Sequence, residues 1–154
     1  MSGMKQGFSA ILLVFLAFGH ASAAELSDIP GDVVTPQAFR DYAEGYTLYF
    51  ERDGEPWGAE SFEEGGATVW RFPDGTCADG AWKAHGAQIC FYYGEGSDVL
   101  CWRMFQDDRG MLARLLGDGP QSGMELRITG RDQRPLLCGE EALPTSAPNA
   151  PYRW

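Results

Sequence analysis

Histidine is scarce in this sequence, and the short motifs of several enzyme classes are absent from it. The chain has two histidines among 154 residues. His20 lies in an apolar leader, and His85 lies in "KAHGA", a pattern typical of an exposed hairpin turn. No Gly-x-Ser-x-Gly stretch occurs, so nothing indicates a hydrolase with a nucleophile elbow. We therefore expect no catalytic residue at His85.

Metal-binding patterns are equally sparse. A zinc site needs several histidine or thiolate ligands, and we expect the four cysteines to be oxidised. The turns "RDGEP", "PDG" and "DDRG" contain Asp and Gly, but the Asp-x-Asp-x-Asp-Gly spacing of a calcium loop, with its distal Glu, is missing. The sequence predicts no metal and no cofactor.

Basic residues are few, with 12 Lys and Arg against 22 Asp and Glu, for a formal net charge of −10. A surface of this sign repels the phosphates of nucleic acids and of anionic lipids. The acidic residues are spread along the chain rather than gathered in one block, a distribution typical of a soluble surface. We expect no nucleic-acid partner.

The sequence has no apolar run long enough for a membrane anchor. Its N-terminal apolar run covers roughly 11 residues, whereas a spanning helix needs about 20. Lys5 precedes this run, and Ala21-Ser22-Ala23 follows it with the small-x-small pattern of a cleavage site. We predict that residues 1–23 are a secretory signal. The mature chain, starting at Ala24, should be periplasmic or secreted and should not insert stably into a membrane.

Changes in composition divide the rest of the chain into three parts. Residues 24–34 contain Pro and Gly without a clear period and predict an extended lead-in. Residues 35–140 are long enough for a single β-rich domain with its own core. The last residues, 141–154, are rich in Pro, Ala and Ser and predict a flexible tail.

One helix is predicted over residues 36–44, at the start of the domain. Thr35 can cap its first turn, Pro36 occupies a position where its missing N–H costs little, and Gly45 can end the helix. Phe39, Tyr42 and Ala43 fall on one face, so the helix should lie against something apolar.

From Tyr46 onward, short aromatic and β-branched runs alternate with turn residues. The runs are "YTLYFER", "WGAESFE", "ATVWRF", "GAWKA", "QICFYY", "VLCWRMF", "MLARLL" and "MELRIT". "MLARLL" is also compatible with one turn of helix. Apolar and polar residues alternate in the first and last of these runs, as they do in half-buried strands. The fold class we predict is mainly β, an antiparallel meander of about seven or eight strands that forms a small barrel or a sandwich.

Four cysteines in an exported chain predict two disulfides. If "GEGS" is a hairpin loop with Tyr93 opposite Asp98, facing residues have numbers that sum to 191, and Cys90 faces Cys101. A facing pair can come close enough for a cross-strand bridge. This leaves Cys77 to pair with Cys138. A redox-active pair is the alternative, but no Cys-x-x-Cys spacing occurs.

Glu60 stands out among the carboxylates. In "WGAESF" it alternates in register with Phe62, which would direct its side chain towards the interior. A buried carboxylate is costly unless it is paired, and Arg71 or Arg103 on neighbouring strands could be the partner. We expect a structural ion pair, with carboxylate catalysis as the alternative.

Aromatic residues are abundant in the strand region, and some of them should line a pocket or an exposed patch rather than the core alone. The candidates for ligand or partner binding are Trp57, Trp70, Trp82, Trp102 and Tyr92. Plain core packing is the alternative for each of them.

A stretch of several motifs carries a family resemblance. It comprises a helix beginning near Thr35, then "EGYTLYF", "GAESF", "VWRFPDGTCADGAW" and "ICFYYGEGSDVLCW". Between Thr35 and Trp102 the chain resembles a family of small exported proteobacterial proteins of unknown function. The Gly- and Trp-rich meander is also similar, more distantly, to the small barrels of lipocalin-like proteins and periplasmic enzyme inhibitors. That likeness transfers no functional residue.

The function that these patterns favour is non-catalytic. We expect an exported protein that binds a small apolar ligand, an envelope component or another protein. A periplasmic hydrolase that uses carboxylates such as Glu60 is one alternative. An inhibitor of an exported enzyme, with residues 24–32 as the inhibitory segment, is another.

Overall fold

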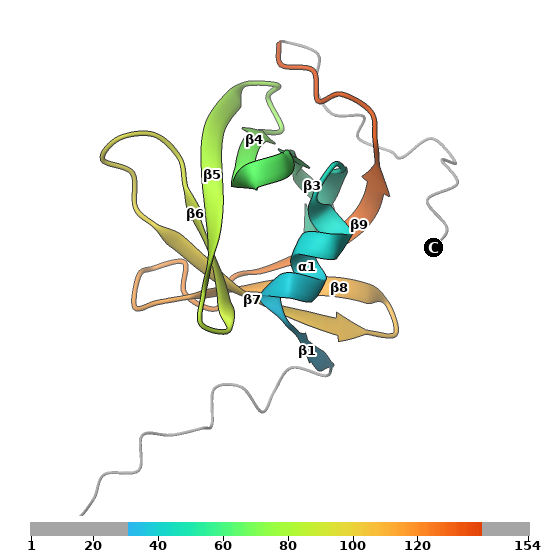
Figure 1. Cartoon of the computed structure of the whole chain (residues 1–154), viewed down its shortest axis with the longest axis vertical. Coiled ribbons are helices and arrows are strands. Elements are labelled where there is room, and N and C mark those ends of the chain that lie inside the picture. Colours follow the sequence, from blue (N-terminus) through green and yellow to red (C-terminus); the bar gives the residue numbers. More distant parts are fainter. Residues whose placement is uncertain (1–30, 140–154) are drawn as a thin grey trace, which may run out of the picture.

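Eight antiparallel strands close into a barrel (Figure 1). The computed structural model describes residues 31–139. The barrel strands are β2 (Thr47–Arg52), β3 (Glu55–Phe62), β4 (Ala67–Arg71), β5 (Cys77–His85), β6 (Gln88–Tyr92), β7 (Leu100–Asp107), β8 (Gly110–Leu116) and β9 (Glu125–Asp132). Neighbours in sequence pair throughout, and β2 pairs with β9 to close the ring. Each of these strands therefore has a partner on both sides.

All eight predicted strand runs are strands of this barrel, so the mainly β fold class is confirmed. The sequence left barrel and sandwich open, and the β2–β9 pairing decides for a barrel. "MLARLL" is β8, paired with β7 along its length, and not a turn of helix. The predicted alternation also holds at both ends of the meander, since Leu48, Phe50, Leu126 and Ile128 are all buried.

Strand β1 (Asp32–Val34) was not predicted; these residues were expected to be an extended lead-in. It pairs with Met104–Gln106 of β7. Pairing between β6 and β7 ends at Trp102, so β1 takes the same edge of β7 further along the strand. Three residues are too few to show an alternating pattern. Residues 24–30 of the lead-in, the predicted signal and the predicted tail lie outside the described residues, and so does most of the segment proposed to inhibit an enzyme.

Helix α1 (Pro36–Ala43) closes one end of the barrel, here called the helix end. The Thr35 hydroxyl accepts a hydrogen bond from the Ala38 amide at 3.1 Å, as the sequence predicted for an N-cap. Phe39 and Ala43 are fully buried, and the Phe39 ring meets Phe62 and Trp82 edge to face at 5.5 and 5.6 Å. Figure 1 shows α1 surrounded by the barrel strands.

The opposite end of the barrel is formed by four connections and is here called the mouth. They are residues 53–54, 72–76, 93–99 and 117–124, which join β2 to β3, β4 to β5, β6 to β7 and β8 to β9. In contrast to the helix end, no helix covers the mouth in the described part of the chain. Within the same residues, the structure has no helix with the length and apolar character needed to cross a membrane.

Both predicted disulfides are present. Cys90 and Cys101 face each other on the outer side of β6 and β7, with their Cα atoms 4.0 Å apart. Cys77, at the start of β5, is bonded to Cys138 beyond the last strand. Two disulfides are typical of proteins that fold in an oxidising compartment.

The second disulfide fixes an external strap, residues 133–138, against the barrel. The strap begins beside β2, where the Thr47 hydroxyl donates to the Arg134 carbonyl at 2.9 Å, and it ends at Cys77 on β5. It must therefore cross the outer faces of β3 and β4, which lie between β2 and β5. Ala59 and Arg71, which face outward on these two strands, are both buried.

Candidate ligand cavity

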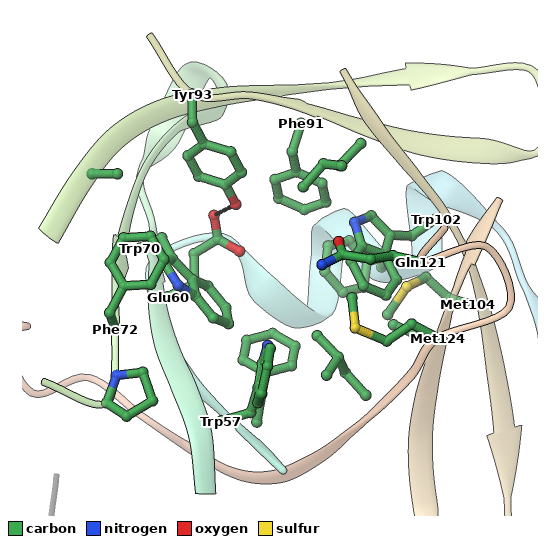
Figure 2. A pocket seen from close by; sticks show the side chains of 17 residues that line it. Trp57, Glu60, Trp70, Phe72, Phe91, Tyr93, Trp102, Met104, Gln121 and Met124 are labelled. Carbon is green, nitrogen blue, oxygen red and sulfur yellow. Dashed lines mark hydrogen bonds between the residues drawn. The ribbon is translucent and has the colours of Figure 1, made fainter. Parts of the chain in front are cut away.

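A cavity of about 310 Å³ occupies the barrel between α1 and the mouth (Figure 2). Small-molecule sites usually measure roughly 300–1,000 Å³, so the cavity is at the small end of that range. Its lining is almost wholly apolar. The residues that line it are Phe39, Phe50, Trp57, Glu60, Trp70, Phe72, Pro73, Ala78, Phe91, Tyr93, Leu100, Trp102, Met104, Ala113, Gln121, Met124 and Leu126.

The cavity is accessible from the mouth. Its lining residues nearest the solvent are Trp57 and Phe72, which are 36% and 42% exposed, together with Pro73 and Gln121. Phe39 of α1, at the other end of the cavity, is 1% exposed. The lining near the mouth is therefore mostly apolar and partly aromatic, and the helix closes the other end of the cavity.

Glu60 places a carboxyl group inside this apolar space. The side chain is 2% exposed, as the alternation with Phe62 predicted. One of its oxygens, Oε1, accepts a hydrogen bond of 2.6 Å from the Tyr93 hydroxyl. In Figure 2 the other carboxyl oxygen points away from Tyr93 and towards the open part of the cavity. The carboxyl group thus has one side held by Tyr93 and one side turned to the cavity.

Burial is the largest influence on this carboxyl group, and it raises the pKa of Glu60 from 4.5 to about 7. The hydrogen bond from Tyr93 stabilises the ionised form and opposes this rise. The nearby Thr68 hydroxyl also favours the ionised form, although its oxygen forms no hydrogen bond with the described residues. The pKa of Tyr93 is raised well above 10 by burial first, and then by the Glu60 charge and the hydrogen bond.

Two glycines make room for the rings beside Glu60. A Cβ atom on Gly80 would lie 2.6 Å from Cδ1 of Tyr93, so only glycine lets that ring lie flat against β5. A Cβ atom on Gly58 would lie 2.3 Å from Cζ2 of Trp70, which is the residue paired with Glu60 across β3 and β4. Both glycines act by close approach, because neither has a positive φ.

The five aromatic candidates fall into two groups. Trp57, Trp70 and Trp102 line the cavity, where a ligand would touch them. Trp82 does not line it; the side chain is 2% exposed and packs against Phe39, with the Arg40 guanidinium 4.3 Å from the ring centroid. Tyr92 is 40% exposed on the outer face of β6, so its neighbour Tyr93 takes the inward position.

The predicted ion pair of Glu60 with Arg71 or Arg103 is not what the structure shows. Glu60 pairs with Trp70 across the two strands, so the next residue, Arg71, has its side chain on the outer face. Arg103 follows the inward-facing Trp102 and lies on the outer face of β7. The partner of Glu60 is instead the hydroxyl group of Tyr93.

Tyr93 and the two glycines are the functional positions that sequence reasoning missed. Tyr93 lies 33 residues from Glu60 and is brought to it by two intervening strands, so no local spacing marks the pair. One signal was present: if Cys90 and Cys101 bridge on the outer face, Phe91 and Tyr93 must point inward. Gly58 and Gly80 inside strand runs were also a signal of close approach.

No set of three or more His, Cys, Asp or Glu side chains in residues 31–139 is placed to hold a metal ion. His85 ends β5 at an exposed hairpin, with Gly86 in the left-handed region at φ +61°. Glu51, Glu63 and Glu64 do not line the cavity, so Glu60 is the one carboxylate among its described lining residues.

Comparison with known proteins gives no match: no family model, no curated protein and no solved structure is significantly similar to this chain. The resemblance to exported proteobacterial proteins therefore stays an expectation.

Proposed function

We propose that this protein binds a small, largely apolar molecule inside its barrel, in an oxidising compartment outside the cytoplasm. The observation that carries the proposal is the cavity itself. It is open at the mouth, closed at the helix end, and lined by aromatic and aliphatic side chains. A barrel of eight strands is just wide enough to be filled by its own side chains or to hold one small ligand.

The single carboxylate favours binding over hydrolysis. Glycoside hydrolysis usually needs two carboxyl groups about 5–9.5 Å apart across the substrate. Among the described residues that line the cavity, Glu60 is the one side chain of this kind. Its neighbours are aromatic rings and a phenol, which suit recognition of an apolar molecule.

Export is supported by two independent features. The N-terminal sequence has the charge, apolar run and cleavage pattern of a secretory signal. The two disulfides join segments that are 11 and 61 residues apart, and such bonds persist in an oxidising compartment.

A fluorescence titration with N-phenyl-1-naphthylamine, a neutral apolar probe that brightens in dry surroundings, tests the binding function. We expect saturable binding by the wild type. Ala78 lies on the cavity side of β5, so Ala78→Phe should fill the space beside the mouth and weaken binding at least about tenfold, or 1.4 kcal/mol.

Ala81→Phe is the matched control. Ala81 lies on the same strand but on its outer face, opposite Tyr92, so the same substitution leaves the cavity unchanged. Unfolding curves of both variants establish that each is folded. The proposal is wrong if the wild type shows no saturable binding, or if both folded variants bind the probe equally well.

A further inference from the structure

The proposed function leaves the chemistry of the ligand open, and four observations narrow it. Resting on that function, we propose that the ligand is an apolar organic cation, a molecule whose ammonium group is held against the Glu60 carboxylate at the inner wall of the barrel.

The first observation is an unpaired buried carboxylate. Glu60 is the one side chain among the described lining residues that is acidic or basic at neutral pH, and it forms no salt bridge within residues 31–139. A buried carboxylate without a cation is costly, and one hydrogen bond from Tyr93 offsets only part of that cost. A ligand cation would supply the missing partner.

The second observation is where the free side of the carboxylate lies. Figure 2 shows the carboxyl oxygen that is not bonded to Tyr93 facing the open cavity, with Trp70, Phe91 and Trp57 around the same space. An ammonium group placed there would donate to this oxygen without displacing the Tyr93 hydrogen bond.

The third observation is the aromatic surround. Trp70 lies directly across from Glu60, and the centroids of the Trp70 and Phe50 rings are 5.4 Å apart. Phe91 and Tyr93 stack at 6.1 Å with an angle of 6° between their planes. Aromatic faces attract organic cations through their quadrupoles, and they do so best where water is excluded.

The fourth observation is the sign of the charge at the mouth. The four connections of the mouth, together with Glu55 at the start of β3, contain no Lys, Arg or His. They carry six exposed acidic residues, Asp53, Glu55, Asp74, Glu95, Asp98 and Asp118. Two bases flank this rim: Arg52 lies over the Trp57 ring at 5.0 Å and pairs with Asp53 at 3.6 Å, and Arg71 has its side chain on the outer face of β4. A rim of this sign raises the local concentration of cations and disfavours anions.

Binding of a cation should depend on pH, because the carboxylate must be ionised. Tyr93, which directly follows β6, is the other titratable group that faces Glu60, and it stays neutral. The inward side chains of the remaining neighbours are uncharged: Leu48 and Phe50 on β2, Thr68 and Trp70 on β4, and Ala78 on β5. Affinity for an ammonium ion should therefore rise from pH 5.5 to pH 8. At the lower pH, binding of the cation should release the proton of Glu60.

Isothermal titration calorimetry of the full mature chain with two matched probes tests this inference. The probes are 2-phenylethylammonium and 2-phenylethanol, which share the ring and linker and differ in charge. At pH 8 we expect the ammonium ion to bind at least about tenfold more tightly than the alcohol. At pH 5.5 that preference should disappear.

Glu60→Gln supplies the second arm, because it keeps the shape of the side chain and can accept from Tyr93 but carries no charge. The variant should lose the preference for the ammonium ion at pH 8 and keep its affinity for the alcohol. Glu55→Gln, which removes an exposed charge from the rim, should change the ammonium affinity less than threefold.

The outcomes separate this inference from the proposed function. If N-phenyl-1-naphthylamine binds but the ammonium ion is not preferred, or if Glu60→Gln leaves the preference intact, the cation inference is wrong and the cavity function stands. If none of the three probes binds, both are wrong.

Discussion

Gly80 and Tyr93 lie in contact inside the barrel, and a Cβ atom on the glycine would be 2.6 Å from the tyrosine ring. The contact holds the phenol where its hydroxyl donates to Glu60 at 2.6 Å. A strand position with no side chain thus sets the geometry of the one carboxylate among the described lining residues of the cavity.

Gly80→Ala should lower the free energy of unfolding by about 1–3 kcal/mol, because the new methyl group overpacks against an aromatic ring and pushes it from Glu60. Urea unfolding measures the change. Gly119→Ala is the control, since no atom lies within 4 Å of its Cβ position and its φ is not positive. A Gly80→Ala variant as stable as Gly119→Ala would show that the contact is unimportant.

Glu60→Gln should alter the pH dependence of stability. The folded-state pKa of Glu60 is about 7 and its ordinary value is 4.5, so the native protein binds this proton more tightly than the unfolded chain. The wild type should therefore lose stability as the pH rises from 4.5 through 7, on the order of 3 kcal/mol from this group. Glu60→Gln should lack that loss.

Comparing urea unfolding of the wild type and Glu60→Gln at pH 5 and pH 8 isolates this effect. All other titratable groups are the same in the two proteins, so their contributions cancel. The variant should gain on the wild type at the higher pH. If the stability difference between the two proteins were the same at pH 5 and at pH 8, Glu60 would have an ordinary pKa and would not be in a dry site.

Tyr93→Phe should destabilise the protein more at pH 8 than at pH 5. At the higher pH the lost hydrogen bond is to a carboxylate, and such a bond is worth about 1.5–3 kcal/mol against about 1 kcal/mol for a neutral one. The substitution also raises the pKa of Glu60 further. Chemical denaturation at both pH values measures the two costs, and a loss that is independent of pH would contradict the assigned partner.

The two disulfides should contribute unequally to stability. A disulfide stabilises the fold by lowering the entropy of the unfolded chain, and more so for a longer loop. The stabilisation is about 3 kcal/mol for the loop closed by Cys90 and Cys101, and about 4 kcal/mol for the longer loop closed by Cys77 and Cys138. Replacing Cys77 and Cys138 with alanine also frees the end of the strap from β5. Thermal unfolding of the two double variants should therefore rank the Cys77–Cys138 variant lower, and the reverse order would contradict the role of the strap.

Local sequence pattern was sufficient for much of the fold. Aromatic and β-branched runs between turn residues identified β2 to β9, and the constant sum of facing residues placed Cys90 opposite Cys101, as the structure has it. These features depend on neighbours within one hairpin. The signals for Thr35 and Pro36 at the start of α1 are local in the same way.

The remaining features depend on contacts between distant strands. Closure into a barrel rests on pairing between β2 and β9, which are about 80 residues apart in the chain, and no local pattern reports it. The partner of Glu60 was assigned to an arginine because charge was considered without strand register. Pairing of Glu60 with Trp70 sends Arg71 outward and leaves Tyr93, just after β6, to fill the space over Gly80.

The most direct test of ligand binding inside the barrel is a ¹H–¹⁵N NMR titration of the indole N–H signals with N-phenyl-1-naphthylamine. Individual Trp→Phe variants assign the signals. Binding in the cavity predicts saturable shifts for Trp57, Trp70 and Trp102, which line it, and a much smaller shift for Trp82, which packs beside α1. Saturable shifts confined to Trp82, or none at the three cavity tryptophans, would contradict it.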